Sequence, residues 1–85
     1  MGIKELKGFK KAFRKQSAKI QSKFLIALEK LLSNPSDPQL HNHALKGKFF
    51  GLKSFNVTGD VRVHYKKVGN NLIFIKIGTH SQLYG

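Results

Sequence analysis

The stretch VRVHYKKVGNNLIFIKIGT, residues 61–79, decides the fold class of this sequence. Apolar and polar residues alternate from Val61 to Tyr65, which is the period-two pattern of a strand with one buried face. The segment Gly69-Asn70-Asn71 is typical of a hairpin connection, and residues 72–79 return as a more fully apolar strand. We therefore predict an antiparallel pair of strands whose outer face carries polar side chains: Arg62, His64 and Lys66.

Two helices are predicted in the first half of the chain. Leu6, Phe9 and Phe13 recur at helical spacing among lysines, which indicates a basic amphipathic helix. Ser17 is a suitable N-cap for a second helix, and the Asn34-Pro35 pair ends it because the residue before proline avoids the helical region. The apolar stripe of this second helix consists of Ile20, Phe24, Ala27, Leu28 and Leu31, widened by Leu25 and Leu32, and it leaves Ile26 outside.

The remaining segments complete a small sheet. Residues 1–6 allow a short first strand, residues 49–58 form one further strand, and Thr58-Gly59-Asp60 forms the turn after it. The predicted fold class is α+β, with two N-terminal helices packed on a small, mostly antiparallel twisted sheet. The length of 85 residues corresponds to a single domain, residues 1–85.

The charge balance of the chain is strongly basic. Sixteen Lys and Arg residues against four Asp and Glu residues give +12, a repulsive surplus that a polyanionic partner would neutralise. A basic surface without a partner remains an alternative, and an anionic membrane is disfavoured because no broad Leu- or Trp-rich face accompanies the lysines. The absence of cysteine excludes disulfides and thiolate zinc sites. No membrane-spanning run or secretory signal is found, so we expect a cytoplasmic protein with no membrane partner.

The polar residues of the second half suit RNA cleavage. When a ribose 2′-hydroxyl attacks the adjacent phosphate, the reaction needs a base, an acid and a cation that stabilises the phosphorane. Histidine titrates near neutral pH and arginine binds phosphate in a bidentate manner. The chain carries these residue types at His41, His43, His64, His80 and Arg62. From these residues alone, non-catalytic RNA or DNA binding remains open, as does a metal site at His41 and His43.

Three motifs occur together in residues 42–85. They are His43-Ala-Leu45-Lys-Gly47, Asp60 followed by Tyr65, and the ending Gly78-Thr79-His80-Ser-Gln-Leu83-Tyr84. This part of the chain resembles the C-terminal half of the RelE/YafQ superfamily of bacterial type II toxins, and the YafQ-like branch most closely. The resemblance implies a fold similar to that of microbial ribonucleases, cleavage of mRNA in the ribosomal A site, and silencing by a cognate antitoxin.

The resemblance also implies roles for single residues. His43 and Asp60 match residues of catalysis or acid–base balance, and His80 matches the general acid. Tyr84 matches a terminal aromatic that shapes the site, and Arg62 matches an arginine of RelE-like members that stabilises phosphate charge. Asp60 could equally serve its turn, and Tyr84 could cover the end of the sheet. Substrate binding is expected at Lys46, Lys48, Lys53, Asn56, His64 and Lys66.

The sequence departs from the YafQ-like pattern at two positions. Such toxins often carry a histidine where this chain has Asn56 and a tryptophan where it has Val61, and His64 matches no family motif. A catalytically impaired toxin, a ParE-like gyrase poison and a basic RNA-binding protein are therefore alternatives, although the retained His43 and His80 disfavour the ParE-like one. We expect a metal-independent endoribonuclease without cofactors, an acidic antitoxin as partner, and contacts from the basic helices to 16S rRNA.

Overall fold

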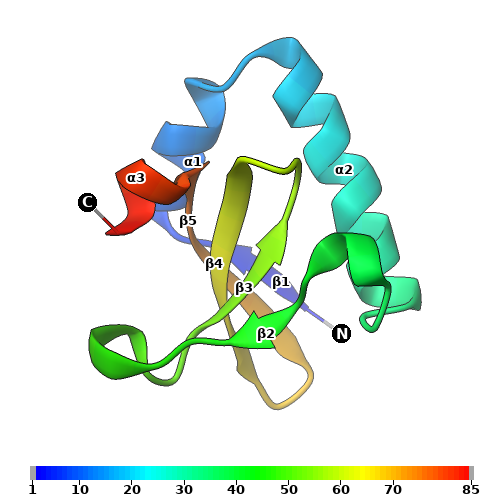
Figure 1. The fold of residues 1–85 in the computed structure, drawn as a ribbon, viewed down its shortest axis with the longest axis vertical. Helices are drawn as coiled ribbons and strands as arrows, with labels where there is room; N and C mark the ends of the chain where they lie inside the picture. Colours follow the sequence, from blue (N-terminus) through cyan, green and yellow to red (C-terminus); the bar gives the residue numbers. More distant parts are fainter. Residues whose placement is uncertain (1, 85) are drawn as a thin grey trace.

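A computed structural model describes residues 2–84 of the protein, and within them five strands form one sheet in the order β1-β5-β4-β3-β2 (Figure 1). The strands are β1 (Ile3–Glu5), β2 (His43–Ala44), β3 (Lys53–Asn56), β4 (Val61–Val68) and β5 (Asn71–Thr79). The helices are α1 (Lys7–Arg14), α2 (Ala18–Ser33) and α3 (His80–Tyr84), with short 3₁₀ turns η1 (Pro38–Leu40) and η2 (Gly47–Phe49). β1 is parallel to β5 and the other strand pairs are antiparallel, so the predicted α+β class is confirmed.

An aromatic core joins α1 and α2 to one face of the sheet. The ring centre of Phe9 in α1 lies 5.5 Å from that of Phe74 in β5. The ring of Phe24 in α2 lies 5.7 Å from Phe74 and 6.4 Å from Phe55 in β3. Edge-on and tilted contacts of this kind stabilise the fold beyond the burial of the rings. Tyr65 is buried in the same core, as predicted, so this face of the sheet is structural.

The second helix begins and ends where the sequence predicts. Ser17 Oγ accepts a hydrogen bond from the backbone N–H of Ile20 at 3.2 Å, and the helix ends just before Asn34. The expectation that Leu25 and Leu32 join its buried stripe is wrong, since they are 61% and 45% exposed. Each follows a buried residue by one position, which turns it about 100° around the helix axis and away from the sheet.

The segment before β4 differs from the predicted single strand. Within the expected strand at residues 49–58, only β3 (Lys53–Asn56) is a strand, because η2 and the loop after it occupy residues 47–52 and residues 57–60 form a bend. Gly47 and Gly51 have φ angles of 67° and 96°, left-handed values that favour glycine and interrupt a strand. The expected first strand is present as β1, while Met1 lies outside the described residues. None of the helices in the described part of the chain is long and apolar enough to cross a membrane.

Candidate active site

Strand pairing brings polar residues from four strands into one row on the outer face of the sheet. From β2 to β5, the successive strand partners are His43, Ser54, His64 and Lys76. Two residues away along each strand, and so on the same face, a second row consists of Asn56, Arg62 and Gly78. Side chains alternate between the two faces of a sheet, so both rows lie opposite the aromatic core. The structure therefore groups two of the predicted catalytic residues, His43 and Arg62, with a lysine that was not predicted.

His64 occupies the centre of the first row and is buried. It is 1% exposed, because the rings of Phe49 and Tyr84 lie 5.4 and 5.0 Å from its own ring. The Tyr84 hydroxyl and His64 Nε2 form a hydrogen bond of 2.9 Å. The loop around η2 and the C-terminal helix therefore cover His64, although alternation assigns it to the polar outer face.

The surroundings of His64 favour the neutral form of its ring. Burial lowers the pKa of His64 below its ordinary value of 6.5, and the charges of Lys76, of His43 in its protonated form, and of Arg62 lower this pKa further. A neutral imidazole has one N–H group and one acceptor nitrogen. Nε2 can therefore form its hydrogen bond with the Tyr84 hydroxyl in either neutral tautomer.

His43 lies at the edge of the row with one ring nitrogen already engaged. Its Nδ1 is 2.7 Å from the carbonyl oxygen of His41, and a carbonyl only accepts, so Nδ1 carries the proton of the neutral ring. Nε2 is then unprotonated, as a general base requires. The rings of His41 and His43 lie 4.5 Å apart, but within residues 2–84 no third histidine or carboxylate completes a metal-binding group with them.

A capping box fixes the start of α3 and with it the place of His80. The Thr79 hydroxyl accepts a hydrogen bond from the backbone N–H of Gln82 at 3.2 Å, and Gln82 Oε1 accepts one from the backbone N–H of Thr79 at 2.9 Å. A Cβ atom at Gly78 would lie 2.7 Å from Gln82 Oε1, so glycine leaves room for this return contact. His80 is the first residue of α3 and is exposed, with its ring 4.5 Å from the Tyr84 ring. The Thr-x-x-Gln pattern is the sequence signal that could have predicted this helix.

Arg62 and its neighbours contribute further polar groups. Arg62 Nε and Asn56 Oδ1 are buried and have no hydrogen-bond partner among the described residues. Asp60 is exposed in the turn before β4. There, Thr58 Oγ1 accepts hydrogen bonds from the backbone N–H groups of Asp60 and Val61 at 3.2 and 3.0 Å. The hydroxyl of Thr58, and not the carboxylate of Asp60, therefore closes this turn.

The lysines expected to bind substrate do not all share one face. Lys46 and Lys48 are exposed on the loop around η2, and Lys66 is exposed toward the hairpin end of β4. Lys53 instead lies on the helix-covered face, where it pairs with the buried Tyr65 of β4. Sequence reasoning missed Lys76, although a single lysine inside the apolar run of β5 is a detectable signal.

Solved structures of bacterial toxins share this fold. YafQ from E. coli strain BL21(DE3) has a TM-score of 0.85 at 23% identity, over 98% of this chain and 97% of that chain. A copper-bound mutant toxin from Helicobacter pylori has a TM-score of 0.75 at 28% identity, over 99% of both chains. The E. coli DinJ–YafQ toxin–antitoxin complex gives 0.74 at 24% identity, over 98% of this chain and 96% of that chain. The fold is thus that of bacterial toxins of this class.

The sequence itself identifies the family. Residues 1–85 match the family described as the bacterial toxin of type II toxin–antitoxin systems, YafQ. The chain therefore belongs to the YafQ family of type II toxins, which confirms the resemblance seen in residues 42–85. No curated protein matches the chain.

Proposed function

We propose that this toxin is a ribonuclease that cleaves mRNA through attack of a ribose 2′-hydroxyl on the adjacent phosphorus. The P–O5′ bond breaks, which leaves a 2′,3′-cyclic phosphate and a 5′-hydroxyl end. His43 Nε2 takes the proton from the 2′-hydroxyl, and His80 donates a proton to the leaving 5′-oxygen. Arg62 and Lys76 stabilise the charge of the phosphorane, while Asp60 adjusts the acid–base balance from the rim.

The hydrogen bond between His43 Nδ1 and the His41 carbonyl carries this proposal. In the neutral ring this contact assigns the proton to Nδ1 and leaves Nε2 as the acceptor nitrogen. His43 lies in the same row of strand partners as Lys76, and Arg62 lies in the adjacent row, which supports a joint role for the three side chains. The base, the acid and the cations are all side chains, so the proposed reaction requires no metal ion.

Ribosome-bound mRNA is the proposed substrate because the positive charge extends well beyond the site. The net charge is +12, and α1 alone exposes four cations: Lys7, Lys10, Lys11 and Arg14. Basic surfaces of this kind bind phosphate backbones through the release of counterions. We therefore place the basic helices against 16S rRNA, with the site directed toward mRNA in the ribosomal A site.

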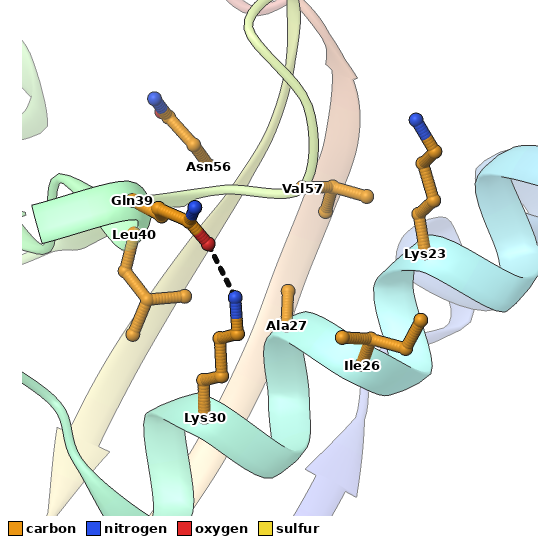
Figure 2. Close-up of a pocket in the computed structure, with 8 residues that line it drawn as sticks. All are labelled: Lys23, Ile26, Ala27, Lys30, Gln39, Leu40, Asn56 and Val57. Carbon is orange, nitrogen blue, oxygen red and sulfur yellow. Dashed lines mark hydrogen bonds between the residues drawn. The ribbon is translucent and has the colours of Figure 1, made fainter. Parts of the chain in front are cut away.

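An acidic antitoxin is the proposed partner of the free toxin. A hollow of about 260 Å³ lies between α2, η1 and the end of β3 (Figure 2). Its apolar lining includes Ile26, which is 56% exposed, and Leu40, and it carries the cations Lys23 and Lys30. Figure 2 shows Lys30 of α2 reaching across to Gln39, with which it forms a hydrogen bond.

The size and lining of this hollow suit a protein anchor. Typical small-molecule pockets measure about 300–1,000 Å³, so this one fits an apolar side chain of a partner better than a whole ligand. An acidic residue beside that side chain would face Lys23 and Lys30. The toxin–antitoxin complex of the E. coli relative supports a partner of this kind for the present chain.

Mapping of mRNA ends in cells tests the proposed function. After induction of the toxin, we expect new 5′-hydroxyl ends inside translated codons, and none in untranslated controls or with a His80→Gln variant at equal protein level. A DNA damage response without mRNA cuts would indicate a ParE-like activity instead. Growth arrest with neither signal would indicate a binding-only toxin.

A further inference from the structure

His64 and Tyr84 form a buried polar contact that the proposed acid–base step does not use. The two residues are 20 positions apart and join the middle of the sheet to the C-terminal helix through their 2.9 Å hydrogen bond. Phe49 packs on both, with its ring 5.4 Å from His64 and 5.1 Å from Tyr84. A buried polar group must form hydrogen bonds, whereas an apolar residue could fill the same space without that requirement. The histidine at this position therefore calls for a functional explanation.

α3 is held at both of its ends. It spans only five residues, His80–Tyr84, and a helix this short is unstable without tertiary contacts. The capping box of Thr79 and Gln82 fixes its first turn, and the His64 contact fixes its last residue. The ring of His80 lies 4.5 Å from the ring of Tyr84, tilted by 32°. Displacement of Tyr84 would therefore release the ring of His80 as well.

We propose that His64 is a positioning residue: it holds Tyr84 in place and, through the Tyr84 ring, sets the orientation of the His80 imidazole. This inference rests on the proposed ribonuclease function, in which His80 is the general acid. A positioning role requires a rigid group that does not itself react. His64 meets this requirement because it is almost fully buried and bonded, and because Lys76 of β5, His43 of β2 and Arg62 of β4 all disfavour its charged form.

Paired substitutions test this role by their effect on the cleavage of a defined mRNA on purified ribosomes. His64→Leu and Tyr84→Phe each remove the same hydrogen bond, so each is expected to lower kcat about tenfold with little change in KM. The double variant is expected to be no slower than the single variants, because contacting residues that act through one interaction are not additive. His64→Gln carries an amide near the place of Nε2 and should recover most of the activity.

Ser54→Ala is the matched control for these variants. Ser54 is the strand partner of His64, is fully buried, and its hydroxyl has no hydrogen-bond partner within residues 2–84. Its replacement changes the packing beside His64 without touching the contact with Tyr84, and kcat should stay within about twofold of the wild type.

A second measurement does not depend on activity. In NMR spectra, the ring signals of His80 should shift in His64→Leu and Tyr84→Phe but not in Ser54→Ala. Unchanged His80 signals in both variants, or losses of kcat that multiply in the double variant, would overturn the positioning role. Tyr84→Phe removes one oxygen and keeps the inference testable if His64→Leu does not fold. Failure of the wild-type toxin to cleave RNA would refute the proposed function, while the NMR comparison would still decide the contact's role.

Discussion

At the scale of single residues, the proposed chemistry depends most directly on His80. Replacement by glutamine keeps a polar side chain of similar length but removes the titratable proton, so we expect cleavage to fall by about 10²–10⁴-fold. The residue is exposed at the start of α3, and its loss should leave the unfolding temperature unchanged. Cleavage assays on ribosomes and thermal unfolding of the same preparation measure both effects. Growth arrest at the wild-type level by a folded His80→Gln protein would remove His80 from the role of general acid.

His64 gives the free energy of unfolding a pH dependence of known sign. Burial, followed by the charge of Lys76, lowers its pKa in the folded protein below the ordinary 6.5. Between the folded pKa and 6.5 the unfolded chain therefore binds more protons, and stability rises with pH through this window. Denaturant unfolding at a series of pH values should show a loss of stability below pH 6.5 that is smaller in His64→Gln. Equal pH dependence in the two proteins would show that His64 does not contribute it.

The pair His41 and His43 bears on the role of metal ions. Their rings lie 4.5 Å apart, while the proposed mechanism uses His43 as a base and not as a ligand. The toxin is first treated with a chelator and then assayed with ribosomes in the magnesium concentration that ribosomes need. We expect this treatment to leave the rate of cleavage unchanged. Loss of activity that a single divalent ion restores would instead assign His41 and His43 to a metal site.

At the scale of elements, the capping box of α3 should control the site more than the stability of the fold. Gln82→Ala removes the side chain that closes the box on the backbone of Thr79, so the amides of α3 should exchange faster with solvent and cleavage should fall. Because α3 spans only five residues, the free energy of unfolding should change by less than about 1 kcal/mol. Ser81→Ala, at the exposed neighbouring position, is the control and should change neither quantity. Equal exchange rates in the two variants would mean that the box does not hold the helix.

The elements that could be predicted from the sequence are those with long periodic patterns. The apolar stripe and Ser17 N-cap of α2, and the alternation in β4, predict both elements and their buried faces. The elements η2 and α3 depend instead on features of only a few residues. These are the left-handed backbone conformation of Gly47 and the capping box that begins at Thr79. The burial of His64 could not be predicted, because alternation places it on the polar face and Tyr84 covers it from 20 positions further along the chain.

The candidate site was predictable to a similar extent. Arg62 lies on the outer face, as alternation predicts, whereas His43 lies in β2, a two-residue strand that the sequence did not predict. The expectation for Lys53 named substrate binding and no face; alternation from the buried Phe55 places this side chain on the helix-covered face. The elements β2 and η2 are too short for a periodic pattern to predict them.

At the scale of the whole molecule, the surface offers different contacts to the two proposed partners. The proposed RNA substrate would meet the surface charges of the toxin, whose net charge is +12. An antitoxin segment can combine such charges with apolar burial in the hollow lined by Ile26, Leu40 and Val57. Acidic segments of this kind are often disordered until they bind. Charge complementarity speeds their association, and apolar burial slows their release.

The two complexes should therefore respond differently to salt. Binding of RNA should weaken steeply, because each phosphate contact adds about 0.9 to the slope of log affinity against log salt concentration for duplexes, and about 0.7 for single strands. The antitoxin complex should keep most of its affinity over the same range, since the apolar contact at Ile26 is not screened. Affinity measurements on the RNA complex and on the antitoxin complex at a series of salt concentrations give the two slopes of log affinity against log salt concentration. An Ile26→Ser variant, exposed and outside the core, should weaken the antitoxin complex alone. If both complexes dissociate at the same salt concentration, or if Ile26→Ser leaves antitoxin affinity unchanged, the hollow is not the antitoxin's anchor.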